Sequence, residues 1–149
     1  MPVMGYTKFE RFFRVGAGVD VDRNDMKRYL DFVNDAIYDL LLAGQATAEA
    51  NGGDIIRPVD LPITPGLQET MHDFRKLDED IELRPILDDI TARPPLSYAL
   101  GEETEERLPM VFGGISVAIA KTLKILDPQD RRIQPSEWDR AFRIFDILI

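Results

Sequence analysis

The sequence has no cysteine, and His72 is the single histidine among its 149 residues. Without cysteine, the chain can form neither disulfides nor thiolate metal sites, and nothing points to an oxidising compartment. No apolar run reaches the roughly 18 residues that a membrane span needs, and the N-terminal stretch MPVMGYTKFER lacks a signal-peptide core. We therefore expect a cytoplasmic protein that makes no membrane contact.

Basic residues are also scarce. The chain carries 18 lysines and arginines against 27 acidic residues, which gives a formal net charge of −9. Nucleic-acid-binding proteins are typically basic overall or have one strongly basic face, so any basic spots here lie on an acidic body. The hydrophobic fraction of 44% is enough for one domain with a buried core.

The common motifs of catalysis are missing. The sequence contains no G-x-x-x-x-G-K-[ST], no G-x-G-x-x-G and no H-E-x-x-H. His72 lies in a helical segment, where an isolated histidine is more often a surface or interface residue than a catalytic one. The acidic stretches DEDIE and GEETEE lack the ligand spacing of a cation-binding loop and fit a solvated face better. We expect no enzymatic activity, no cofactor and no metal site.

Apolar residues at helical spacing predict an all-α chain. The predicted order is short helix, long helix and third helix, twice over, at residues 6–15, 23–50, 65–77, 86–90, 108–126 and 135–149. Asn51-Gly52-Gly53 ends the first long helix. Pro109 either starts or kinks the second one. No strand is long enough for a sheet, so we expect at most a two-strand contact between two loops.

Those two loops carry an internal repeat. The stretches DIIRPVDL (54–61) and RRIQPSEW (131–138) share the skeleton Ile-x-Pro-x-acid-apolar. The spacing is constant, since 133 − 56 = 77 and 137 − 60 = 77. Such a repeat indicates two similar halves, at 1–77 and 78–149, within one compact domain.

A pair of glycines interrupts the second long helix. At the same spacing, Ala36 near the middle of the first long helix aligns with Gly113, which Gly114 follows. A glycine inside a helix costs about 1 kcal/mol relative to alanine, so the pair needs a packing reason. We interpret it as the point where the two long helices cross closely. A local flexible point, or a kink shared with Pro109, is the alternative.

This outline resembles the histone fold, in which a long helix lies between two short ones and an extended loop precedes the third. The residues that carry the resemblance are Arg131, Arg132, Ile133, Glu137 and Trp138 in the second half, and Ile55, Ile56, Asp60 and Leu61 in the first. Two such halves in one chain resemble a tandem, pseudodimeric histone fold, as in a family of short bacterial and archaeal proteins. The resemblance implies a pseudo-two-fold axis. This axis would place the loop before one third helix beside the loop between the other half's first two helices.

In histone-fold proteins these paired loops touch DNA phosphates, so the resemblance implies a set of candidate DNA contacts. They are Arg131 and Arg132 with Arg14 at one end and Arg57 with Arg93 at the other, with Arg23, Lys27 and Arg28 as additions on the first long helix. The alternative is that these are ordinary surface arginines paired with Asp130, Asp54 or Asp60.

The sequence departs from the histone pattern in its loops. The arginine that often locks the loop onto the acid of the last helix falls at Gly53 and Asp130, so the lock is absent or rebuilt. Asp54 stands where the first loop's basic residue belongs. We therefore expect at most weak, salt-sensitive, non-sequence-specific DNA binding.

A protein-interaction scaffold is the alternative function. The last helix, RAFRIFDILI, is apolar on more than one face. One side carries Phe142, Phe145 and Ile149, and the rest carries Ile144, Ile147 and Leu148. This excess indicates either a surface for self-association or a protein partner, or a deeply buried terminal helix.

Overall fold

The computed structural model of the chain describes residues 3–81, 98–129 and 132–148. Within these residues the chain is mostly helical, which confirms the all-α class. The helices are α1 (Val3–Ala17), α2 (Arg23–Ala50), α3 (Pro65–Ile81), α5 (Glu102–Leu126) and α6 (Pro135–Leu148). One 3-10 turn, η1 (Pro58–Asp60), and two short strands, β1 (Ile55–Ile56) and β2 (Ala99–Leu100), complete the described elements. The helix predicted at 86–90, with its expected end at Arg93, lies outside the described residues.

The ends of α2 are set by local chemistry. Asp22 accepts a hydrogen bond from the Asp25 amide at 2.8 Å, and Asp25 accepts one from the Asp22 amide at 3.1 Å, forming a capping box. At the other end, the Gly53 amide donates to the Ala48 carbonyl at 2.8 Å, and Gly52 takes a φ of 74°. The predicted bounds of this helix, 23–50, are therefore confirmed.

Pro109 lies inside α5, which begins at Glu102 rather than near residue 108. The option that Pro109 starts the helix is therefore wrong. The helix begins earlier because the Gly101 amide donates to the Ile56 carbonyl at 2.9 Å, which anchors its first turn. By length and composition α5 could cross a membrane, but 72% of its apolar window is buried inside the structure. That burial is the pattern of a core helix.

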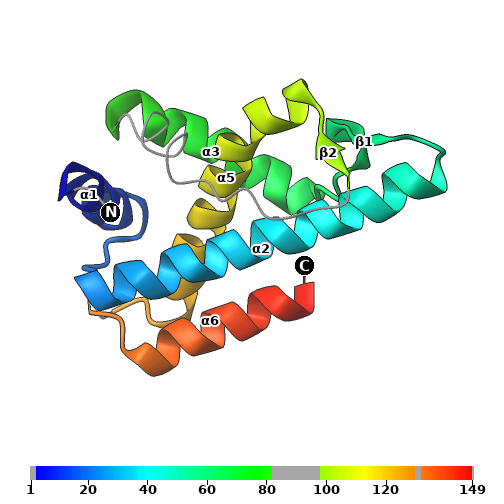
Figure 1. Cartoon of the computed structure of the whole chain (residues 1–149). Coiled ribbons are helices and arrows are strands. Elements are labelled where there is room, and N and C mark those ends of the chain that lie inside the picture. The colour runs from blue at the N-terminus through cyan, green and yellow to red at the C-terminus, as the bar shows by residue number, and fades with distance from the viewer. Residues whose placement is uncertain (1–2, 82–97, 130–131, 149) are drawn as a thin grey trace.

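The two long helices cross as expected (Figure 1), but the glycines of α5 face α3 rather than α2 at this level. The hydroxyl of Tyr29 on α2 hydrogen-bonds to that of Ser116 on α5, and the rings of Tyr29 and Phe112 meet edge to face at 6.1 Å. A side-chain carbon added to Gly113 would instead overlap the ring of Phe74 on α3. The glycines therefore allow α3, rather than α2, to approach α5 closely. The prediction of a close approach is correct, but the predicted helix pair is wrong.

The short parallel strand pairs relate the two halves. Ile55 pairs with Ala99 in β1 and β2, and an isolated bridge joins Asp20 to Arg132. At the repeat spacing of 77, Ile55 maps onto Arg132 (132 − 55 = 77), whereas Asp20 maps two residues short of Ala99 (99 − 20 = 79). The expected strand contact between the two Ile-x-Pro loops is therefore wrong. Each loop pairs instead with the segment that precedes the other half's long helix.

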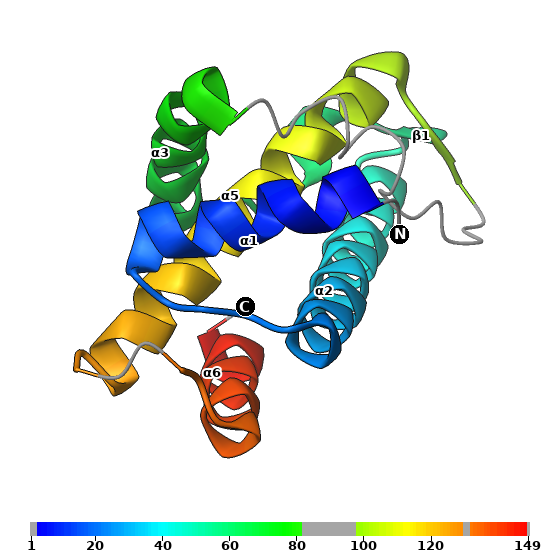
Figure 2. The same ribbon diagram turned by 90° about the vertical axis from the view of Figure 1, so that its left-hand side faces the viewer.

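The third helix of each half packs on the long helix of the other half. α3 lies against α5 through the glycines, whereas α6 lies beside α2 through aromatic rings. Phe32 stacks on Phe142 at 4.2 Å and meets Phe145 edge to face at 5.9 Å. Figure 2 shows α1 lying across α5, between α3 and α2. The buried Phe9 of α1 contacts the rings of Tyr29 and Phe112.

Candidate functional site

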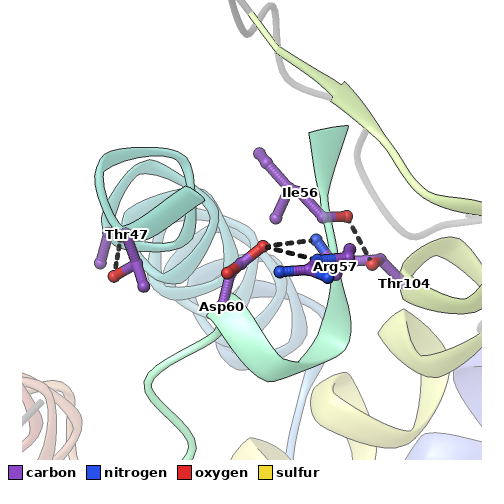
Figure 3. A network of polar contacts seen from close by, with 6 residues as sticks. Thr47, Ile56, Arg57, Asp60 and Thr104 are labelled. Atoms are coloured by element: carbon purple, nitrogen blue, oxygen red, sulfur yellow. Dashed lines mark hydrogen bonds and ion pairs between the residues drawn. The ribbon is translucent and has the colours of Figure 1, made fainter. Parts of the chain in front are cut away.

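The first Ile-x-Pro joint is held by a small polar network (Figure 3). The Ile56 carbonyl accepts hydrogen bonds from the Thr104 hydroxyl at 2.7 Å and the Gly101 amide at 2.9 Å. The Arg57 amide donates to the buried Asp60 carboxylate at 2.9 Å, and the Arg57 guanidinium lies 3.8 Å from the same oxygen. For Arg57, the alternative of an arginine paired with Asp60 is therefore confirmed.

The second joint repeats this geometry one spacing later. The Gln134 amide donates to the Glu137 carboxylate at 3.1 Å, and these residues are 57 + 77 and 60 + 77. Ile133 and Trp138 are buried, as their counterparts Ile56 and Leu61 are. Gln134 carries no charge, however, and the second carboxylate oxygen of Glu137 has no hydrogen-bond partner in the described part of the chain. The loop lock is thus rebuilt by Arg57 in the first half, whereas no arginine of the described residues pairs with Glu137 in the second.

Two predicted contacts, Arg14 and Arg132, come together in a groove of about 630 Å³. The groove lies where the end of α1, the start of α2 and the loop before α6 meet, and Arg28 also lines it. The bridge between Asp20 and Arg132 brings these segments side by side. The predicted grouping of Arg132 with Arg14 is confirmed, and Arg131 lies outside the described residues.

Carboxylates share this groove with the arginines. Arg14 lies 3.6 Å from Glu10 and 3.7 Å from Asp20. Arg28 lies 4.0 Å from Asp139, outside the groove. The groove is also lined by Asp22 and Asp25, and burial raises the pKa of the Asp25 carboxyl. Most of the positive charge that a phosphate would meet is therefore already balanced by neighbouring acids.

Arg132 differs from Arg14 in this respect. Its side chain is exposed, and no described carboxylate forms an ion pair with it. Arg23 and Lys27 are also exposed, on the first two turns of α2. Of the predicted loop arginines that the structure describes, Arg14 and Arg57 each have an acidic partner, whereas Arg132 has none among the described residues.

The opposite end of the molecule is less suited to phosphate. Arg57 is held by Asp60, and its predicted companion Arg93 lies outside the described residues. The neighbouring first turn of α5 carries Glu102, Glu103 and Glu105. Acids favour a helix N-terminus electrostatically, and here they would repel a phosphate.

Sequence reasoning missed a second cationic cluster. His72 and Arg75 of α3 line a pocket together with Arg107 of α5. The signal was present in helical spacing, because Arg75 follows Met71 by four residues and Arg107 precedes Val111 by four. The spacing alone does not bring these side chains together, because that requires knowing that α3 packs on α5 at the glycines. Among the described residues, no group of three or more histidine or acidic side chains is placed to hold a metal ion.

The chain belongs to a family of proteins that share a domain of unknown function, DUF1931, whose model matches residues 9–146. An uncharacterized protein of Aquifex aeolicus (strain VF5) is 28% identical over 120 residues, which span 80% of this chain and 70% of the relative.

Two solved structures resemble the whole chain. A crystal structure of a protein from Thermus thermophilus is 45% identical, with a TM-score of 0.85, over 96% of this chain and 97% of its own. A 1.9 Å crystal structure of the Aquifex aeolicus protein AQ328 is 25% identical, also with a TM-score of 0.85, over 97% of this chain and 95% of its own. The arrangement of helices described above is therefore shared across the length of these proteins.

Proposed function

We propose that this member of the DUF1931 family is a tandem histone-fold protein that acts as a protein-interaction scaffold rather than as a DNA-wrapping protein. The histone-like part of the proposal is supported by the relation between the halves. The acid-capped joints at Asp60 and Glu137 exchange at the spacing of 77, and the bridges at Ile55–Ala99 and Asp20–Arg132 exchange to within two residues.

The scaffold function is supported mainly by the ion pairs that the predicted contact arginines form with neighbouring acids. Arg14 is balanced by Glu10 and Asp20, and Arg57 by a buried Asp60. Non-specific DNA affinity depends on the number of phosphates that free cations neutralise. On a body of net charge −9, paired arginines contribute few such contacts.

The last turn of α6 supplies the apolar surface of the scaffold. Ile147 and Leu148 are 83% and 73% exposed, whereas Phe145, one turn before, is buried. The alternative of a deeply buried terminal helix is therefore wrong for this turn. We propose that a second copy of the chain covers it, because a patch that meets itself across a two-fold axis closes a dimer.

Light scattering coupled to size-exclusion chromatography tests this scaffold. We expect the apparent mass to rise with protein concentration in the wild type and to stay at the monomer value in Ile147→Ser/Leu148→Ser. Ile125→Ser is the matched control, because Ile125 is 79% exposed at the far end of α5. A wild type that stays monomeric at every concentration contradicts self-association.

Weak DNA binding is the second candidate, and the groove that joins Arg14 to Arg132 favours it. A mobility-shift titration with duplex DNA separates the two functions at about 20 mM salt, where screening is weak. The scaffold predicts no retarded complex. A retarded complex that Arg131→Ala/Arg132→Ala weakens would support phosphate contact at this end instead.

A further inference from the structure

A pocket of about 440 Å³ lies between η1, α3 and α5, where it borders residues of the hydrophobic core such as Leu61 and Val111. Its floor is apolar and includes Leu61, Met71 and Val111. Val59, which also lines it, is 78% exposed. Its size falls within the roughly 300–1,000 Å³ typical of small-molecule sites.

The glycines of α5 explain why the pocket exists. A side-chain carbon on Gly114 would overlap Met71, so only glycine lets α3 approach α5 this closely. Arg75 lies one helical turn beyond Met71, and Arg107 lies one turn before Val111. The same close approach that forms the apolar floor therefore brings two guanidinium groups to one pocket.

The charge of the pocket is opposite to that of the chain. His72, Arg75 and Arg107 line it, and no acidic residue does so within the described ranges. No described carboxylate lies within ion-pair distance of Arg75 or Arg107. Elsewhere on this protein of net charge −9, Arg14, Arg57 and Lys121 each have an acidic partner. Two unpaired arginines above an apolar floor thus set this pocket apart.

We propose that this pocket binds a small organic anion, namely a carboxylate carried on an apolar chain. The guanidinium groups bind the carboxylate, since arginine presents paired donors that match its two oxygens. The apolar chain lies along Met71 and Val111, where it is removed from water. This inference goes beyond the scaffold function and does not depend on it.

Sodium octanoate is the probe for this site. Isothermal titration calorimetry with octanoate should give saturable binding, and NMR of methyl-labelled methionine should show a shift at Met71. Acetate keeps the charge without the chain, and 1-octanol keeps the chain without the charge. The affinity for each of these two compounds is expected to be lower than that for octanoate by about tenfold or more, because each makes only one of the two contacts.

The variant Arg75→Gln/Arg107→Gln should lose about tenfold or more in octanoate affinity through the loss of charged hydrogen bonds. Its control is Arg140→Gln/Arg143→Gln, which removes the same charge from exposed positions of α6. All four arginines are exposed, so circular dichroism should show both variants folded. Absent octanoate binding, equal binding of 1-octanol, or unchanged affinity in Arg75→Gln/Arg107→Gln would overturn the proposal.

Discussion

Gly113 of α5 faces the ring of Phe74 on α3, with no room between them for a methyl group. Phe74 is almost completely buried and meets Phe12 of α1 edge to face at 6.4 Å. The ring is therefore held from both sides, and it cannot swing away to admit a larger residue. This contact fixes how α3 lies on α5, and with it the pocket that both helices line.

Gly113→Ala should consequently destabilise the protein. Alanine favours a helix by about 1 kcal/mol over glycine, but overpacking a filled core typically costs about 1–3 kcal/mol. We expect a net loss in the free energy of unfolding, measured by urea denaturation. Gly66→Ala is the control, because a methyl group there lies 4.0 Å from its nearest neighbour, the Thr64 hydroxyl. Equal stabilisation of both variants would contradict the packing role of Gly113.

The buried hydrogen bond between the hydroxyls of Tyr29 and Ser116 predicts that removing one hydroxyl costs more stability than removing the other. Ser116 donates to the Phe112 carbonyl at 2.7 Å, which leaves the Tyr29 hydroxyl to donate to Ser116. Ser116→Ala strands the fully buried Tyr29 hydroxyl, whereas Tyr29→Phe leaves Ser116 with its carbonyl partner. We expect about 1–3 kcal/mol lost in Ser116→Ala and about 1 kcal/mol in Tyr29→Phe. Chemical denaturation measures both losses in unfolding free energy. A larger loss in Tyr29→Phe than in Ser116→Ala would contradict the assignment of Tyr29 as the donor.

Stability should also fall at alkaline pH because of Tyr29. Burial raises the pKa of its hydroxyl far above the ordinary value of 10.0. A tyrosine whose pKa is raised on folding contributes stability that is complete below about pH 10 and is lost as the pH rises beyond it. Unfolding free energies from pH 8 to 11 should therefore decline more steeply in the wild type than in Tyr29→Phe. Parallel declines would show that Tyr29 ionises without unfolding.

The asymmetry between the two joints predicts a stabilising substitution. Arg57 pairs with Asp60, whereas its counterpart Gln134 leaves one buried oxygen of Glu137 without a described partner. Gln134→Arg should raise the free energy of unfolding by about 0.5–1 kcal/mol at low salt, and less at high salt. The same substitution combined with Glu137→Gln is the control, and it should give no gain. A gain that survives in that control would assign the effect to something other than the ion pair.

Much of the fold could be predicted from local pattern. The bounds of α2 follow from Asp22 and Asn51, and the helical starts at Pro65 and Pro135 follow from proline at the first helical position. The repeated joints were visible because the same skeleton recurs at a constant spacing. These features depend on residues close together in sequence.

Apart from the start of α5 at Glu102, the errors concern which segments meet in space. The glycines of α5 were correctly interpreted as a close approach, but periodicity does not state which helix comes near. The pairing of each Ile-x-Pro loop with the segment before the other long helix leaves no local pattern, since two-residue strands show no alternation, and only the resemblance to the histone fold implied it. The charge of the groove was overestimated, because Glu10 precedes Arg14 by one helical turn and Asp20 reaches it only through the fold.

The pairing of Arg14 with Glu10 and Asp20 is the main support for the proposal that the protein does not bind DNA. Fluorescence anisotropy with a labelled duplex, from about 20 mM salt upward, tests it directly. The wild type should not bind, whereas Glu10→Gln/Asp20→Asn should bind in a salt-sensitive manner. Glu102→Gln/Glu103→Gln, with the same charge change on α5, should not. Wild-type binding whose salt slope flattens in Arg14→Ala/Arg132→Ala would contradict the account.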